Sequence, residues 1–150
     1  MYPRFVPIHR AFIIILALSF PVFPQTAGDK LLGRWYTEEC RAAFDFYRCN
    51  QEYRARMIAL EKPAMIHSKN PVDSLKTRKV NGMVAVYGLT YDPVKNQWVN
   101  GKVYNAENGK TYCCNCVLTG KGTLIFRGFL GISLLGGSQT WTRAECAGKR

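Results

Sequence analysis

The sequence predicts an all-β fold of about eight antiparallel strands, with one long irregular connection and little helix. Short runs rich in aromatic and β-branched residues recur along the chain at roughly regular intervals. Turn-forming residues separate these runs. In the run at 43–49, polar and apolar side chains alternate, with Phe44, Phe46 and Arg48 on one side, as a half-buried strand requires.

The first half is expected to contain three strands and the long connection. The strands are expected at 33–39, 43–49 and 54–60. The stretch 61–82 has no strand pattern, and Pro63 and Pro71 interrupt it. We expect a long connection there, with a helical turn around 72–77.

The pattern in the second half of the sequence predicts a series of β-hairpins. Strands are expected at 83–89, 98–104, 110–118, 123–128 and 138–144, separated by turns such as D-P-V-K-N and T-G-K-G. The apolar segment 129–137 contains Gly131, Gly136 and Gly137. These glycines do not follow a phosphate-binding pattern, and we expect them to allow a tight, closely packed lid segment.

Eight antiparallel strands can form a sandwich or a closed barrel, and a barrel of this size encloses space for one small ligand, as in lipocalins and streptavidin. The first strand opens with Gly33-x-Trp35 and the last ends in Trp141-x-Arg143. In a meander barrel these strands are neighbours, so that Arg143 would lie on the face of Trp35. The alternative is that both tryptophans are ordinary core residues and Arg143 is solvated. The pattern alone leaves the two interpretations even.

Residues 1–27 predict a secretory signal peptide, which leaves 28–150 as a single domain. Arg4 and Arg10 precede a short apolar run at 11–20, and small residues end at Ala27. The run is shorter than the roughly 20 apolar residues of a membrane-spanning helix. The protein is therefore expected to be exported, periplasmic or secreted, with no transmembrane span after signal removal. An uncleaved N-terminal anchor is the alternative.

The formal net charge is +11, or +9 without Arg4 and Arg10. A basic exported protein can be attracted weakly to anionic envelope surfaces, but a soluble surface with more lysine than acid is the favoured explanation of the charge. The basic residues are scattered rather than clustered, so no nucleic-acid partner is expected.

The chain has six cysteines: Cys40, Cys49, Cys113, Cys114, Cys116 and Cys146. An even number in an oxidising compartment favours disulfides. Within a strand Cys114 and Cys116 face one way and Cys113 the other, which disfavours bridges inside the cluster. We expect each of the three to pair with a distant cysteine, and six connectivities stay open. A redox role for free thiols is the alternative.

No metal site and no cofactor are expected. The sequence has no C-x-x-C pair, and His67 is the one histidine after residue 27, whereas structural zinc sites use two spaced ligand pairs.

Three stretches resemble a known family: N-P-V-D-S-L-K-T-R-K-V-N-G-M, W-V-N-G-K-V-Y-N-A-E-N-G-K-T-Y and R-G-F-L-G-I-S-L-L-G-G-S-Q-T-W-T-R. It is the bacterial secreted family named domain of unknown function 2147, and the resemblance covers roughly 33–143. It implies a small exported barrel of the lipocalin-like, or calycin, type. It also implies that Gly33, Trp35, Trp141 and Arg143 close that barrel, but it brings no established activity.

The sequence departs from the family at two places. The family often has a second cysteine shortly after the position of Cys49, where this chain has Arg54. The segment Tyr104-Asn105-Ala106 replaces the commoner Tyr-Asp-Pro. The disulfide plan of relatives therefore does not carry over.

The favoured function is binding or carrying a small hydrophobic or amphipathic ligand in the cell envelope. Such a ligand would lie against alternating residues inside the barrel, namely Val86, Trp98, Tyr104, Tyr112 and Phe126. Basic residues at the rim would recruit an anionic headgroup. Small residues facing inward would leave the necessary void, and Gly88, Gly101 and Ala85 are candidates.

The alternative is a structural or protein-interaction role in the envelope, with the barrel filled by its own side chains. An enzyme is not expected, because no catalytic constellation is visible. His67 lies in the long connection without the context of a catalytic triad and is expected to be a solvated loop histidine. Glu38 and Glu39 at a strand end are expected to face solvent.

Overall fold

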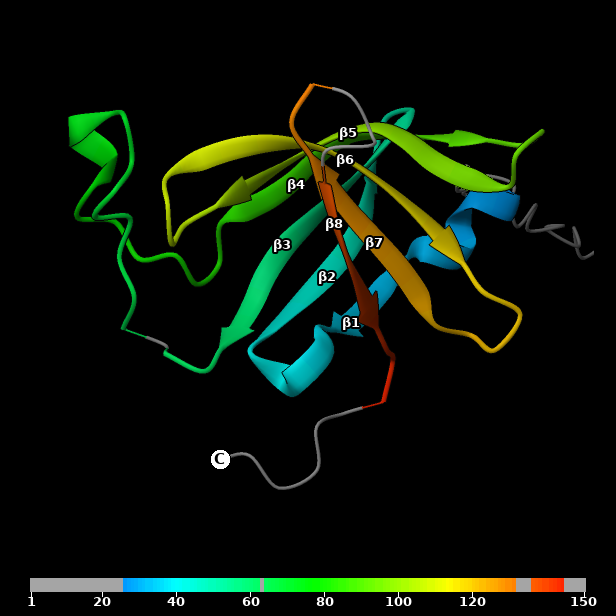
Figure 1. The fold of residues 1–150 in the computed structure, drawn as a ribbon, viewed down its shortest axis with the longest axis horizontal. Helices are drawn as coiled ribbons and strands as arrows, with labels where there is room; N and C mark the ends of the chain where they lie inside the picture. Colours follow the sequence, from blue (N-terminus) through cyan, green and yellow to red (C-terminus); the bar gives the residue numbers. More distant parts are fainter. Residues whose placement is uncertain (1–25, 63, 132–135, 145–150) are drawn as a thin grey trace, which may run out of the picture.

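The computed structural model describes residues 26–62, 64–131 and 136–144. Within them, eight antiparallel strands form one sheet in chain order (Figure 1). The strands are β1 (Gly33–Tyr36), β2 (Ala42–Cys49), β3 (Glu52–Leu60), β4 (Val84–Asp92), β5 (Gln97–Asn105), β6 (Lys110–Leu118), β7 (Leu124–Phe129) and β8 (Gly136–Trp141). Three short 3-10 helices complete the fold: η1 (Ala27–Leu31), η2 (Glu38–Cys40) and η3 (Asp73–Leu75). The predicted all-β class is confirmed. All but the last two residues of the predicted signal peptide lie outside the described residues.

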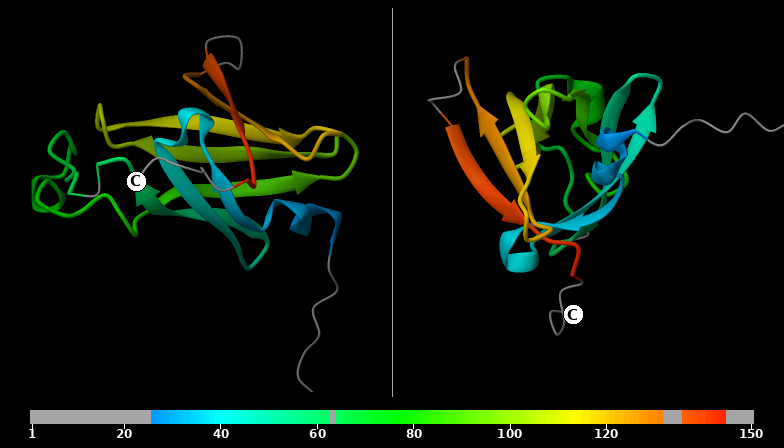
Figure 2. Two further views of the ribbon diagram at one scale, coloured as in Figure 1. Left: turned by 90° about the horizontal axis from the view of Figure 1, so that it is seen from below. Right: turned by 90° about the vertical axis from the view of Figure 1, so that its right-hand side faces the viewer.

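The sheet curls into a half-barrel whose two end strands meet at one point (Figure 2). Tyr36 and Thr142 form an isolated antiparallel bridge, with N–H to O distances of 2.7 and 2.9 Å. Because β1 has only four residues, the seam between β1 and β8 has little backbone pairing. Side chains must therefore supply much of the closure.

One end of the half-barrel, which we call the closed end, is covered by η1. Two buried indole groups bond to this helix: Trp98 Nε1 donates to the carbonyl oxygen of Gly28 at 3.1 Å, and Trp35 Nε1 donates to that of Leu31 at 2.8 Å. A buried indole N–H needs such an acceptor, so these bonds fix the helix over the two rings. Leu31 fills the space beneath and is fully buried.

Arg143 also lies at the closed end, over Trp35, as expected from the two ends of the sequence. Its guanidinium carbon is 4.1 Å from the centroid of the Trp35 ring, and Nη2 donates to the carbonyl oxygen of Lys30 at 2.7 Å. Gly33 has a φ of +94°, and a Cβ there would lie 3.2 Å from Nη1 of Arg143. Glycine therefore gives the chain both the turn and the room for the arginine.

The opposite end, the open end, carries the long connection between β3 and β4 (Figure 1). An isolated bridge between Ile66 and Lys79 makes it a small hairpin of its own, and η3 is the expected helical turn. The connection is joined to β3 by hydrogen bonds from Met57 N to Met83 O at 2.9 Å and from Gly82 N to Met57 O at 2.7 Å. This segment is thus part of the barrel wall at that end.

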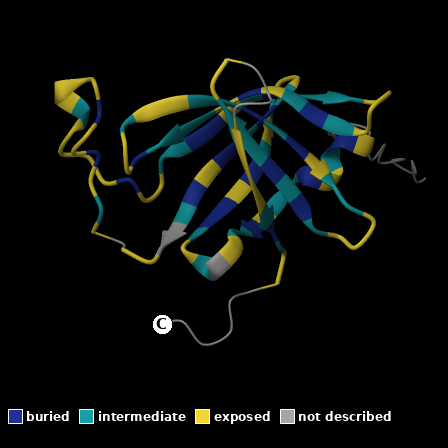
Figure 3. Ribbon diagram, viewed as in Figure 1, coloured by how far each residue is buried: buried dark blue, intermediate teal, exposed yellow. Residues whose placement is uncertain are grey.

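Inward-facing residues of the strands form one core, while exposed residues alternate with them on the outside (Figure 3). Two of the proposed void-forming residues are part of this packed core. A Cβ at Gly101 would lie 2.5 Å from Leu89 Cδ2 and 2.6 Å from Cys114 Sγ, so the neighbours already fill that space. Ala85 is fully buried, and Gly88 adopts a φ of +73° beside the backbone of Asn100. The expected void is not at these three positions.

Four cysteines carry free thiols: Cys49, Cys113, Cys114 and Cys116. The predicted alternation holds, because Cys114 and Cys116 are buried in the barrel while Cys113 lies 3.0 Å from the Nζ of exposed Lys102. The expected bridges from this cluster to distant cysteines are not formed. Cys114 pairs in the sheet with Gly101 and Gly128, in the middle of the barrel wall. Cys40 is not among the free thiols, and Cys146 lies outside the described residues.

Candidate functional site

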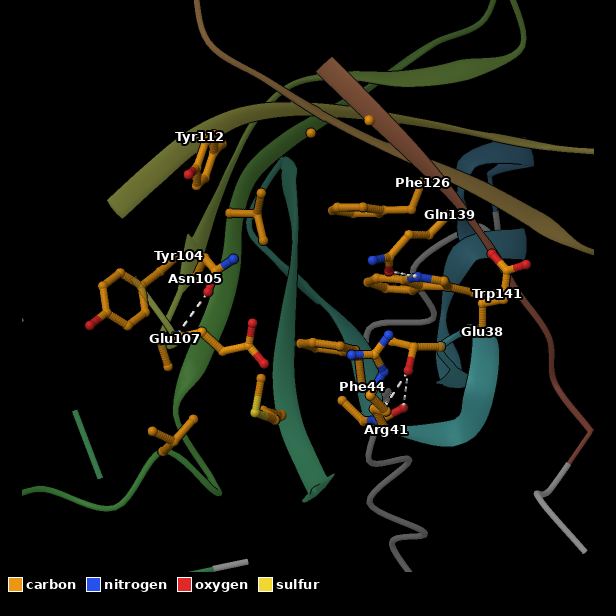
Figure 4. Close-up of a pocket in the computed structure, with 18 of the residues that line it drawn as sticks. Glu38, Arg41, Phe44, Tyr104, Asn105, Glu107, Tyr112, Phe126, Gln139 and Trp141 are labelled. Carbon is orange, nitrogen blue, oxygen red and sulfur yellow. Dashed lines mark hydrogen bonds between the residues drawn. The ribbon is translucent and has the colours of Figure 1, made fainter. Parts of the chain in front are cut away.

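A pocket of about 530 Å³ lies inside the half-barrel toward the open end (Figure 4). Its walls come from the turn before and after η2, from β2, β3, β7 and β8, from the long connection and from the β5–β6 hairpin. The connection supplies Met65 and Val80, and Met57 and Val103 face them from the strands. Most of the wall is therefore apolar, as in binding sites for small organic molecules.

Three stacked aromatic rings form one side of the pocket. Trp141 lies between Phe44 and Phe126, with ring centroids at 4.8 and 4.3 Å and interplanar angles of 6° in both cases. All three residues are buried, and Figure 4 shows their edges directed toward the pocket. The indole N–H of Trp141 donates to Gln139 Oε1 at 3.1 Å, which satisfies it without a ligand. The stack offers the edges of three aromatic rings as an apolar wall to a bound molecule.

A pair of glycines leaves space in this part of the wall. Gly128 in β7 pairs with Gly137 in β8, and both line the pocket. A Cβ at Gly137 would meet nothing within 4 Å, and one at Gly128 would only reach Val103 Cγ1 at 3.8 Å. Gly137 therefore borders open space, contrary to the predicted tight packing. At Gly136 the prediction is correct, because a Cβ would lie 2.6 Å from that of Phe129.

The polar part of the pocket lining carries Glu38, Arg41 and Glu107, together with uncharged Asn105 and Gln139. The expected basic rim is thus wrong: two carboxylates and one guanidinium line the pocket. Glu38 is turned to the seam, where its Oε2 accepts from the Thr140 N–H at 3.5 Å. Most of the basic residues are exposed and do not line this pocket.

Three of the five residues predicted to line a ligand site do line this pocket: Tyr104, Tyr112 and Phe126. Val86 and Trp98 do not, because both are packed in the core, with Trp98 bonded to η1 at the closed end. Trp98 contacts Tyr53 and Tyr91, with ring centroids at 6.4 and 5.2 Å.

Sequence reasoning missed the pocket residues Phe44, Trp141, Met57, Met65 and Val80. The alternation of 43–49 gave a signal for Phe44, and Trp141 was assigned only to closure. Nothing in the pattern marked Met65 or Val80, since their positions depend on how the long connection folds back.

A second pocket, of about 560 Å³, lies between the long connection and β4 to β6. His67 and Asn70, both buried, line it and contact Tyr104. Asn70 Nδ2 donates to the Tyr104 hydroxyl at 3.1 Å, and His67 Nδ1 is 3.3 Å from the same oxygen. Tyr104 lines both pockets, and its hydroxyl points away from the first one in Figure 4. The expectation that His67 is solvated is wrong.

The two buried thiols, Cys114 and Cys116, are expected to have low reactivity. Burial raises the pKa of Cys114 to about 12 and that of Cys116 well above its ordinary value. A thiol is nucleophilic and binds metals as the thiolate, which these shifts disfavour. Among the described residues, no group of three or more His, Cys, Asp or Glu side chains could hold a metal ion. None of the helices in the described ranges is long and apolar enough to cross a membrane.

These features define a lipocalin-like half-barrel with an apolar pocket at one end. The chain belongs to the family described as "Uncharacterized protein conserved in bacteria (DUF2147)", whose model matches residues 33–143. The resemblance predicted from the sequence is therefore confirmed.

The fold is also similar to a solved structure titled "Protein HP1028 from the human pathogen Helicobacter pylori belongs to the lipocalin family". The two share 25% sequence identity and a TM-score of 0.68, over 77% of this chain and 83% of that one. No curated protein matches the chain.

Proposed function

We propose that this protein binds a small hydrophobic or amphipathic molecule in the pocket beside the Phe44–Trp141–Phe126 stack. The single observation that carries the proposal is this pocket, whose volume of about 530 Å³ is within the range typical of small-molecule sites. The aromatic stack and the methionines of the wall suit an apolar body. The lipocalin-like fold supports the same role.

The proposed place of action is the cell envelope or the exterior, after export. The support is in the sequence: a basic start, an apolar run at 11–20 and a small-residue end at Ala27. We propose binding rather than catalysis, since the pocket offers an apolar wall and few polar groups.

A structural or protein-interaction role with a self-filled barrel is the second candidate. The observation that favours it is the dense core, in which Trp35, Trp98 and Leu89 are almost fully buried between the pocket and the closed end. That part of the interior has no room for a ligand. The two candidates differ in whether the remaining pocket is occupied.

Blocking the pocket tests the proposal. Gly137→Leu places a side chain where a Cβ meets nothing within 4 Å, and Gly120→Leu is the matched control, because Gly120 is equally unobstructed in a turn outside the pocket. We expect an apolar fluorescent probe to bind the unaltered protein and the control variant, and to bind Gly137→Leu at least tenfold more weakly. Equal binding to all three would show that the probe does not use this pocket.

Native mass spectrometry of protein purified from its own cells then addresses the natural ligand. A stoichiometric extra mass that is reduced in Gly137→Leu supports a carrier. A ligand-free mass, together with no probe binding, would favour the self-filled structural role.

A further inference from the structure

We infer that the ligand of this pocket carries a cationic end, held by the carboxylate of Glu107. The inference rests on the proposed binding function and names the class of ligand: an apolar body that ends in an ammonium or similar cation. In Figure 4 the side chain of Glu107 extends into the pocket, on the side opposite the aromatic stack.

The β5–β6 turn fixes the position of Glu107. Asn105 Oδ1 accepts from the backbone N–H of Glu107 at 2.8 Å, and the carbonyl oxygen of Asn105 accepts from the N–H of Gly109, also at 2.8 Å. Side-chain bonds of this kind are typical of Asn at turns. The turn is also held from outside, because Gly109 lies against the backbone of Lys69. The carboxylate is therefore presented to the pocket from an anchored backbone.

Of the two carboxylates that line the pocket, Glu107 is the one without a side-chain partner in the part of the chain that the structure describes. Among the described residues it makes no salt bridge, although Lys69 and Lys110 lie near the same turn. Glu38, the other acid, is turned to Thr140 at the seam. Arg41 lies beside Phe44, across the pocket from Glu107 in Figure 4, and it already has an interaction of its own. Glu107 is thus the carboxylate of the lining that is best placed to pair with a bound cation.

One aromatic ring of the same hairpin favours the same chemistry. Tyr112 lines the pocket from β6, whereas the ring of Tyr104 is directed away from the Glu107 carboxylate in Figure 4. Cations, quaternary ammonium groups above all, bind to the faces of such rings. Tyr112 is oriented by Asn108, whose Nδ2 donates to its hydroxyl at 2.8 Å.

The basic character of the whole chain does not oppose this local preference. The formal charge of +11 is spread over the surface, and charges more than about 8 Å apart in solvent are largely screened at physiological salt. Glu107 would be in direct contact with the ligand, within that distance. We therefore expect the affinity for a cationic ligand to fall as salt is raised.

Three probes with one dodecyl chain test the inference: one ends in trimethylammonium, one in sulfate and one in maltoside. Each is titrated below its micelle concentration, and binding that persists in Gly137→Leu is subtracted as binding elsewhere. We expect the ammonium probe to bind the pocket most tightly. Glu107→Gln should weaken it by about threefold to tenfold and leave the maltoside unchanged. Glu61→Gln, which removes an exposed carboxylate that lines neither pocket, is the matched control and should have little effect on any probe.

Each outcome has a distinct meaning. Equal or tighter pocket binding of the sulfate probe, or no effect of Glu107→Gln on the ammonium probe, overturns the cationic ligand but leaves the binding function. Weakening of the sulfate probe by Arg41→Gln would then assign the anchoring role to Arg41. If none of the three probes binds the pocket, the proposed function itself fails, and the inference fails with it.

Discussion

The rings of Phe44 and Trp141 lie parallel, with centroids 4.8 Å apart, although their strands β2 and β8 are not neighbours in the sheet. Between these strands stands β1, which meets the end of β8 through the single bridge of Tyr36 and Thr142. The ring contact thus joins the two edges of the sheet from inside. It is at once part of the closure and part of the pocket wall.

Replacing Phe44 by Leu should weaken the seam. The substitution removes the stacked contact with Trp141 and keeps most of the apolar volume, so we expect a loss of about 1–2 kcal/mol in the free energy of unfolding. Urea denaturation measures it, and the near-ultraviolet circular dichroism of Trp141 should change as well. Phe129→Leu is the control, because Phe129 is only half-buried and stands outside the stack. Equal losses in both variants would show that the stack has no special part in closure.

Arg143 should contribute more to stability than another arginine that lies over a ring. Arg143→Ala loses both the contact with Trp35 and the hydrogen bond to Lys30, for an expected cost of about 1–2 kcal/mol. Arg56 lies 5.6 Å from the centroid of Tyr47 on the outer face, so Arg56→Ala should cost clearly less. Arg143→Lys should recover only part of the loss, since an ammonium cannot reproduce the planar guanidinium over the ring. Urea denaturation of the three variants measures their free energies of unfolding. A loss for Arg56→Ala as large as for Arg143→Ala would contradict the expectation.

The contact of Trp35 with Arg143 was predictable from the sequence because it depends only on topology. In a meander that closes, the first and last strands meet whatever the details of pairing. The location of the pocket could not be predicted in this way, because it depends on strand register as well as on topology. Gly101 and Gly137 look alike in the sequence, yet one faces a packed wall and the other open space. That difference arises from register, which a single sequence specifies poorly for glycine-rich strands.

The rim and the long connection were also beyond sequence reasoning. Glu107 faces inward because two side-chain bonds of Asn105 and Asn108 shape its turn. His67 is buried because Tyr104, far away in the sequence, approaches it across the open end. Neither contact leaves a periodic signal in the sequence, whereas strand alternation does.

Alkaline pH should destabilise the protein through its buried thiols. The pKa of Cys114 is raised from 9.0 to about 12 in the folded state, so the folded protein keeps a proton that the unfolded chain loses. The contribution of this thiol to the free energy of unfolding is fully present below about pH 9. It falls by about 1.4 kcal/mol per pH unit as the pH rises toward 12. Urea denaturation at about pH 8 and about pH 10 measures the change.

Cys114→Ala should reduce this pH dependence and leave the part that buried Cys116 contributes, and Cys113→Ala, at a half-buried position, should not reduce it. An unchanged slope in Cys114→Ala would assign the alkaline loss to other groups, such as Tyr53, whose pKa burial also raises.

The oxidised protein should contain one disulfide rather than three. Four thiols are free in the structure, which leaves Cys40 and Cys146 as the one pair available for a bridge. The intact mass of protein purified under oxidising conditions should then be lower than that of the reduced chain by the two hydrogens of a single disulfide. A mass lower by six hydrogens would restore three bridges and contradict the arrangement of Cys113, Cys114 and Cys116 in β6.

The hydroxyl of Tyr104 should hold the long connection against the open end. Tyr104→Phe keeps the ring in the pocket wall but removes the partner of His67 Nδ1 and of Asn70 Nδ2. Both groups are buried, and a buried polar group without a partner costs about 1–3 kcal/mol. We expect a loss of this size in the free energy of unfolding, with faster amide hydrogen exchange at His67 and Val80, whose N–H groups bond within the connection.

Tyr112→Phe is the matched control for this prediction, because within the described ranges the hydroxyl of Tyr112 bonds to exposed Asn108 alone. Its free energy of unfolding and its exchange rates in the connection should stay close to those of the unaltered protein. Since Met65 and Val80 form part of the pocket wall, Tyr104→Phe should also weaken the binding of an apolar probe, although no atom of the wall is removed. If exchange in the connection is unchanged in Tyr104→Phe, the segment is held by its backbone bonds to β3 alone, and the tyrosine is only a wall residue.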